Sequence, residues 1–290
     1  MGACASTVCR REPSACAYTP ADSAAFLATY RWDGQQIVFS SDRAFDLPSV
    51  GVEEIADPRL YRPATKHQFK RDFNLFVMDA RGGGARQVTR GPFRDLRATY
   101  TPDGERLAFY STRTPRALLW TMPADGSEEP ESLPLEGDPL IDAFRPWYTV
   151  DGETLYFFGM RAIGEPPYRY RLLHVPAAGG VPVPLAFDDE GKSQGPFLEP
   201  NGEFLLFHNN RTGRSELYEF PLGAEQPRML RPPGLVIPAG AQVMHPTRAR
   251  NGTLAFDFSV YAGPPPVLWL RAVRKRLVSA TAWRWRKLFG

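Results

Sequence analysis

Two arginines and a histidine occupy the same position in three repeats of this sequence. Arg97, Arg145 and His245 each stand six residues before an Asp-Gly or Asn-Gly step, where two other repeats have Leu27 and Gly195. Repeats that fold alike bring equivalent positions around a common axis. Two guanidinium groups and an imidazole at one place bind a carboxylate or phosphate through charge-assisted hydrogen bonds. The spacing therefore predicts an anion-binding site at one mouth of a central channel.

A structural alternative remains open for these arginines. Each could instead pair with an acid of its own repeat, such as Asp95 or Asp142, and only stabilise its own unit. A second set of arginines stands ten residues after the turn Asp or Asn, and it comprises Arg43, Arg113, Arg161 and Arg211. For this second set we favour a structural role, because repeats reuse packing devices.

The elements that must position these residues recur with a fixed period. The steps at Asp103, Asp151, Asn201 and Asn251 lie 48, 50 and 50 residues apart, and each precedes a strand-like run. Asp-Gly is expected to take the positive-φ positions of a two-residue hairpin. Residues 97–135 contain four such runs, at 97–101, 105–111, 118–122 and 131–135. Four short antiparallel strands with tight turns make one propeller blade.

The period of nearly fifty residues predicts an all-β fold, a single β-propeller of four-stranded antiparallel blades. We count five blades, and a sixth remains open if the two termini build one together. The expected organisation is a leader at 1–23, the propeller at 24–272 with a long loop at 45–72, and a tail at 273–290. The tail is basic and aromatic, and it is either a closing strand or a surface-binding segment.

These repeats resemble the TolB-like, WD-like β-propeller family. The resemblance rests on a strand, Pro-Asp-Gly, a second strand and Ser-x-Arg, followed by residues 74–80, Gly82-Gly83 and residues 86–90. It covers roughly residues 24–272 and implies the propeller fold. The family includes periplasmic scaffold proteins and propeller domains of peptidases, so the resemblance implies no single function. The last repeat departs from the pattern, because it lacks one residue of the second strand and the matching arginine.

Catalytic motifs are not found in the sequence. It has no Gly-x-Ser-x-Gly elbow and no His-Glu-x-x-His, and His174 and His208 are expected to be packed within strands. The predicted innermost strands offer one carboxylate, Glu199, with no second at an equivalent position. We therefore favour a non-catalytic propeller that binds a protein or peptide partner, without cofactor or metal. The alternative is a hydrolase or lyase that acts on an anionic small molecule or sugar at the channel mouth.

The distribution of charge and the sequences of the two termini limit which partners and which cellular compartment are expected. Residues 271–290 hold seven basic residues and no acid, and removing these from the 35 basic residues leaves 28 against 32 acidic ones. This mildly acidic body gives no reason to expect nucleic acid binding. The start Met1-Gly2-Ala3-Cys4 either fits lipidation at Gly2 and Cys4 or matches that pattern by chance, so a membrane surface stays an open partner, through this terminus or the tail. With no signal peptide or membrane span seen, the sequence favours the cytoplasm.

Overall fold

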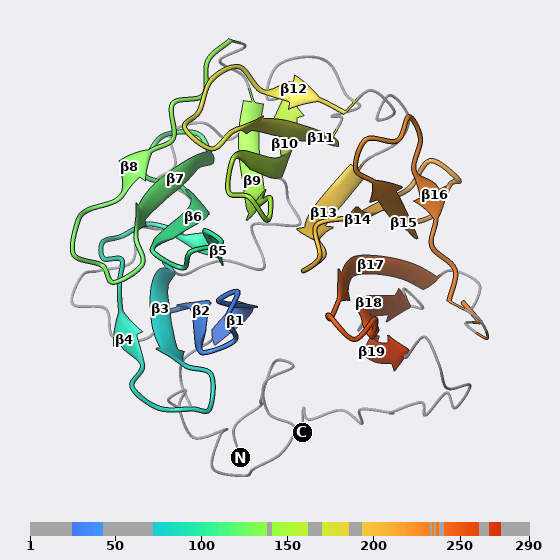
Figure 1. Ribbon diagram of the computed structural model, residues 1–290, viewed down its shortest axis with the longest axis horizontal. Helices are drawn as coiled ribbons and strands as arrows, with labels where there is room; N and C mark the ends of the chain where they lie inside the picture. Colours follow the sequence, from blue (N-terminus) through green and yellow to red (C-terminus); the bar gives the residue numbers. More distant parts are fainter. Residues whose placement is uncertain are drawn as a thin grey trace.

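The described part of the chain consists of β-strands arranged as a ring. The computed structural model describes residues 25–42, 72–137, 141–161, 170–185, 193–232, 234, 236–237, 241–260 and 267–273. These residues include no helix. Their strands form five antiparallel sheets, four of four strands and one of three. The sheets surround a central axis (Figure 1), so the all-β propeller expected from the repeats is confirmed.

Each sheet is one blade, and its strands follow chain order from the axis outward. Blade 1 contains β1 (Ala25–Tyr30), β2 (Gln36–Ser41), β3 (Asn74–Asp79) and β4 (Arg86–Gln87). Blade 2 contains β5 (Leu96–Tyr100), β6 (Arg106–Ser111), β7 (Leu118–Pro123) and β8 (Glu131–Ser132). Blade 3 contains β9 (Ile141–Tyr148), β10 (Thr154–Arg161), β11 (Tyr170–Pro176) and β12 (Val183–Pro184). Blade 4 contains β13 (Ser193–Leu198), β14 (Phe204–Asn209), β15 (Glu216–Pro221) and β16 (Arg228–Met229). Blade 5 contains β17 (Ala241–Arg248), β18 (Leu254–Val260) and β19 (Val267–Val273).

The hydrophobic core lies between neighbouring blades. Val38 and Leu75 of blade 1 pack with Tyr100 and Phe109 of blade 2, and all four are fully buried. Similar clusters join blades 2 and 3, blades 3 and 4, and blades 4 and 5. Alternate residues of a strand face opposite sides of its sheet, so blades 2, 3 and 4 each contribute to two of these clusters. This packing fixes the angular position of every innermost strand around the axis.

The recurrent turns differ in detail from the expected hairpin. The amide of Gly104 donates to the Thr101 carbonyl at 2.9 Å, and Gly104 has φ +79°. Asp103 does not have positive φ, so the expectation that Asp and Gly both adopt it is wrong. The Asp103 carboxylate instead accepts the Glu105 amide at 2.9 Å and the Thr101 hydroxyl at 2.5 Å. The Asp-Gly signal therefore reflects a side-chain acceptor followed by a left-handed glycine.

A β-bulge interrupts each innermost strand at the positions singled out in the sequence. The pairing with the second strand shifts register between Leu96 and Thr99, and at equivalent places in the other four blades. The bulged residues all have positive φ, and they are Leu27 (61°), Arg97 (59°), Arg145 (55°), Gly195 (66°) and His245 (51°). They lie inside strands rather than at their starts, which corrects the placement expected from the sequence. A bulge bends the strand and re-aims its side chain.

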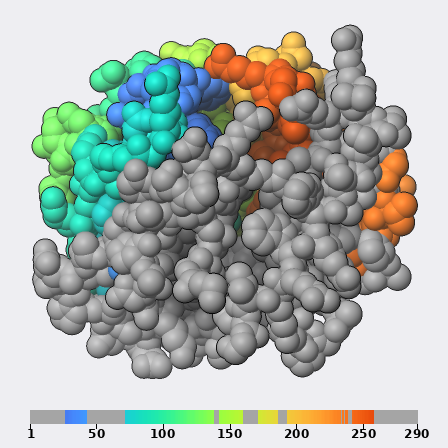
Figure 2. Space-filling model, turned by 90° about the horizontal axis from the view of Figure 1, so that it is seen from below, coloured from blue at the N-terminus to red at the C-terminus, as the bar shows by residue number. Residues whose placement is uncertain are grey.

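Among the described residues, blades 5 and 1 contact each other through their turns. The Arg250 guanidinium donates to the Trp32 carbonyl at 3.2 Å. The space-filling view shows these blades, orange-red and blue, near one another along its upper edge (Figure 2). The predicted leader at 1–23, the lipidation residues Gly2 and Cys4, nearly all of the loop at 45–72 and the tail beyond residue 273 lie outside the described residues. Among the described residues, no helix is long and apolar enough to cross a membrane.

Candidate functional site in the central channel

Two rings of equivalent residues lie on the two inner strands of every blade, one ring on each strand. The first ring is the set of bulged residues described above. The second ring is the residue that follows the recurrent second-strand phenylalanine, and it comprises Ser40, Tyr110, Phe158, His208 and Asp257. Each member of the second ring pairs with the residue that precedes the bulged one, as Tyr110 does with Leu96 and Asp257 with Met244. The registers therefore place the two rings side by side.

Arg97 and Arg145 come together in this channel from blades 2 and 3. Both side chains are half-buried, and the positive charge of Arg97 lowers the pKa of Arg145. Within the described ranges, neither guanidinium forms a hydrogen bond or an ion pair. Asp95 instead pairs with Arg113 at 2.7 Å, and Asp142 accepts the Ala117 amide at 3.2 Å. The alternative in which each channel arginine pairs with its own blade's acid therefore does not hold for the described contacts.

Gly195 occupies the bulged position of blade 4 because a larger residue does not fit there. A Cβ atom at Gly195 would lie 2.8 Å from Arg145 Nη1 and 3.0 Å from the His208 ring. Its φ of +66° is also a conformation that L residues rarely adopt. The absence of a side chain thus lets the Arg145 guanidinium approach His208.

Gly195→Ala is expected to weaken both the fold and the site. The methyl group must displace Arg145 or His208, and the positive φ adds strain, so a loss of about 2 kcal/mol in unfolding free energy is expected. Gly34→Ala is the matched control, because Gly34 has φ +74° but no atom within 4 Å of the added Cβ. Chemical denaturation should show the larger loss for Gly195→Ala. Equal losses would mean that the close approach to Arg145 does not matter.

His245 and Asp257 of blade 5 form a hydrogen-bonded pair beside the arginines. His245 Nδ1 lies 2.7 Å from Asp257 Oδ2, so Nδ1 carries the proton and donates to the carboxylate. The His245 amide donates to His208 Nδ1 at 3.3 Å, which places the ring proton of His208 on Nε2. The two imidazole rings meet edge to face with centroids 5.1 Å apart. His208 therefore belongs to the site, although its position within a strand suggested simple packing.

The channel carries more positive than negative charge. Burial lowers the pKa of Arg97, and burial together with the charge of Arg97 lowers the pKa of Arg145. Burial also raises the pKa of Asp257, while the two arginines act in the opposite direction. Arginine does not lose its proton in proteins, so its lowered pKa measures a free-energy penalty of two poorly compensated charges. A bound anion would relieve that penalty.

The two channel histidines predict acid sensitivity. Burial, followed by neighbouring positive charge, holds the pKa of His208 and of His245 well below the ordinary value of 6.5. The unfolded chain therefore binds protons at a higher pH than the folded chain does, and stability is lost as pH falls below about 6.5. Urea unfolding should show a falling free energy from about pH 7 to pH 5, with a smaller fall in His208→Gln. An identical fall in the variant would contradict the assignment.

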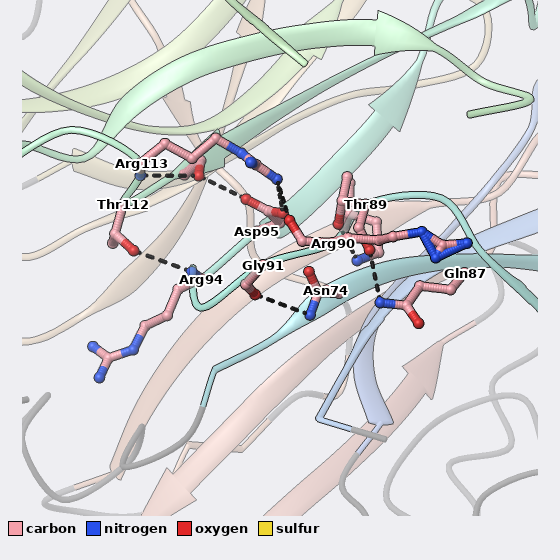
Figure 3. Close-up of polar contacts among 11 residues, drawn as sticks. Asn74, Gln87, Thr89, Arg90, Gly91, Arg94, Asp95, Thr112 and Arg113 are labelled. Atoms are coloured by element: carbon pink, nitrogen blue, oxygen red, sulfur yellow. Dashed lines mark hydrogen bonds and ion pairs between the residues drawn. The ribbon is translucent and has the colours of Figure 1, made fainter. Parts of the chain in front are cut away.

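The second set of arginines has a structural role where it is described. Arg113 donates to buried Asp95 at 2.7 Å and to the Arg90 carbonyl at 3.2 Å (Figure 3). Its guanidinium also lies 4.4 Å from the Phe93 ring centroid. Ser111 donates to the same carboxylate at 2.6 Å. These contacts join the second strand of blade 2 to the segment that enters the blade. The side chains of Arg43 and Arg161 lie outside the described residues.

Two other groups of polar side chains in the described chain are paired, although some buried atoms, such as Tyr100 Oη and Trp120 Nε1, have no described hydrogen bond. A cavity of about 200 Å³ between blades 1 and 2 is lined by Arg31 and Arg86, which bond Asp33 and the Asp125 carbonyl. Glu199, which precedes the turn of blade 4, forms an ion pair of 2.9 Å with Arg248 of blade 5. No group of three or more His, Cys, Asp or Glu suited to a metal ion occurs in the described ranges. In the channel, by contrast, the guanidinium groups of Arg97 and Arg145 have no ion pair among the described contacts.

Fold and channel together define a β-propeller with a cationic centre. No family model and no curated protein matches the chain. Solved structures do match its fold. A structure assigned to TolB from Agrobacterium tumefaciens has a TM-score of 0.59 and 12% identity, over 87% of this chain and 78% of that one. TolB from Acinetobacter baumannii has a TM-score of 0.54 and 15% identity, over 70% of this chain and 46% of that one.

An enzyme is also among the similar structures. An oligogalacturonate lyase in complex with manganese has a TM-score of 0.54 and 13% identity, and the match covers 89% of this chain and 65% of that one. The protein is thus similar to TolB and to other β-propellers, as the sequence resemblance implies. At these identities the likeness shows the fold alone.

Proposed function

We propose that this protein is a binding propeller that receives an acidic group of a protein or peptide partner in its central channel. The observation that carries the proposal is the pair Arg97 and Arg145, which converge without a hydrogen bond or ion pair in the described part of the chain. Uncompensated charge inside a protein is costly, and a partner carboxylate turns that cost into binding free energy. Each charge-assisted hydrogen bond contributes about 1.5–3 kcal/mol.

The residue types at the bulges, rather than the bulges themselves, support binding. The positive φ at Arg97 and Arg145 holds each side chain in an orientation set by a bulge. Leu27 has the same backbone conformation, so the bulge itself belongs to the fold. The residue type at each bulge is what differs between blades. Blades 2 and 3 therefore differ from blades 1 and 4 by having arginines at a backbone position that all five blades share.

Acidic peptides test this proposal. Fluorescence anisotropy would compare a peptide pool rich in Asp and Glu with the same sequences as Asn and Gln, using the full chain. The acidic pool should bind, its affinity should fall with added salt, and Arg97→Met/Arg145→Met should abolish the difference. Equal binding of the acidic and amide pools would overturn the proposal.

A second candidate function rests on a different observation, the 2.7 Å contact between His245 and Asp257 beside both arginines. An imidazole oriented by a carboxylate is the usual form of a general base, and two arginines would hold an anionic substrate next to it. This arrangement fits a lyase or hydrolase that acts on an acidic sugar. Incubation with an oligogalacturonate, followed by ultraviolet detection of unsaturated product, tests it. Product formation that is lost in His245→Gln would favour catalysis over binding alone.

A further inference from the structure

We propose that binding of a ligand with two carboxylates in the channel is coupled to the uptake of one proton, and that His245 accepts this proton. The inference rests on the proposed function and specifies how the site distinguishes a dicarboxylate from a single carboxylate. It follows from the charges and hydrogen bonds of the channel. Arg97 and Arg145 contribute two positive charges, Asp257 one negative charge, and neutral histidines none. A single carboxylate therefore balances the site, whereas a pair of carboxylates leaves one negative charge in excess.

Hydrogen-bond geometry selects the atom that would bind the extra proton. His208 Nδ1 accepts the His245 amide at 3.3 Å, so a proton added to this nitrogen would place two donors against each other. His245 Nδ1 already carries a proton toward Asp257. Among the described contacts, His245 Nε2 has no hydrogen bond. Protonation of His245 Nε2 keeps both existing hydrogen bonds and turns the contact with Asp257 into an ion pair.

The groups around His245 explain why its charge depends on the ligand. Blade 2 contributes Arg97 and Tyr110, blade 3 contributes Arg145, and blades 4 and 5 contribute His208 and Asp257, whereas the bulged residue of blade 1 is Leu27. Burial, followed by the positive charges of Arg145 and Arg97, lowers the pKa of His245. A dianion between them reverses the local field and raises that pKa again. Binding and protonation therefore favour each other.

Calorimetric titration with oxalate and acetate tests the inference. The full chain would be titrated between about pH 8 and pH 6, in buffers of different ionisation enthalpy, and proton uptake follows from the buffer dependence of the heat. Oxalate should bind with close to one proton and tighten up to about tenfold per pH unit, and acetate should bind with much less uptake. His245→Gln should remove the uptake. His174→Gln is the control, because His174 of β11 lies against Tyr156 outside the channel and its loss should change nothing.

The outcomes separate this inference from the function on which it rests. Oxalate binding that requires the arginines but takes up no proton would overturn the inference and leave the proposed function intact. Failure of both anions to bind would overturn both. If His245→Gln does not fold, nitrogen NMR of the wild-type histidines decides instead, since Nε2 of His245 must become protonated when oxalate binds. A peptide with a C-terminal aspartate, free or amidated, shows whether a chain end supplies the two carboxylates.

Discussion

Arg113→Met is expected to destabilise the protein by about 3 kcal/mol, because it leaves the Asp95 carboxylate buried without its ion pair. Asp95 is fully buried, and Arg113 is the cation that it contacts at 2.7 Å. Burial already raises the pKa of Asp95, so its charged form depends on this partner. Urea unfolding near neutral pH measures the loss. The loss should shrink as pH falls, because the orphaned carboxyl group is then protonated.

An exposed ion pair provides the control for this prediction. Arg106 and Glu131 of blade 2 are also 2.7 Å apart, but their side chains are 39% and 68% exposed. Arg106→Met should therefore cost less than about 1 kcal/mol. Combining Arg113→Met with Asp95→Asn should recover part of the stability, since no charge is then left unpaired. Equal losses for Arg113→Met and Arg106→Met would contradict the structural role of the buried pair.

Arg97→Met/Arg145→Met is expected to have opposite effects on stability and on binding. It removes two poorly compensated charges while keeping unbranched side chains of similar length, so unfolding free energy should rise by about 1 kcal/mol. Carboxylate affinity should fall about 100-fold, because two charge-assisted hydrogen bonds of roughly 1.5 kcal/mol each are lost. Thermal unfolding and calorimetric titration of the same preparations measure both effects.

The same pair of measurements excludes simpler explanations. Arg106→Met removes one positive charge outside the channel and should leave carboxylate affinity unchanged, which controls for net charge. If the two arginines form a binding site that costs stability, removing them raises the unfolding free energy and lowers the carboxylate affinity. If the channel variant instead loses stability, Arg97 and Arg145 stabilise the fold through contacts of their own. The binding proposal would then lose its main support.

The fold could be predicted because its signals are local and repeated. Each turn needs a left-handed glycine, as at Gly104, and each second strand places a phenylalanine such as Phe109 in the core between blades. The backbone conformation of the turn could not be predicted in detail. Asp103 was expected to adopt positive φ, whereas its side chain accepts hydrogen bonds from the turn. Asp-Gly fits both arrangements, and only coordinates distinguish them.

Part of the site could also be predicted, because the repeats place equivalent residues around one axis. The position six before each turn found Arg97, Arg145 and His245, because equivalent residues must face the same axis. His208 and Asp257 were missed, since the last repeat is one residue shorter and shifts Asp257 out of alignment with His208. Aligning the repeats on the second-strand phenylalanine would have brought these two residues together. The bulge itself leaves no clear sequence signal, because Leu27, Gly195 and charged residues all occupy it.

A crystal structure of the full chain grown with 4-bromobenzoate, an aryl bromide that does not alkylate cysteine or histidine, would test the central claim most directly. Bromine marks the ligand by its anomalous scattering, and its carboxylate would be located relative to the channel. The account predicts a single strong site on the axis, with carboxylate oxygens at about 2.7–2.9 Å from guanidinium nitrogens of both Arg97 and Arg145. An empty channel with bromine only at the outer surface, or guanidinium groups turned onto other protein groups, would contradict it.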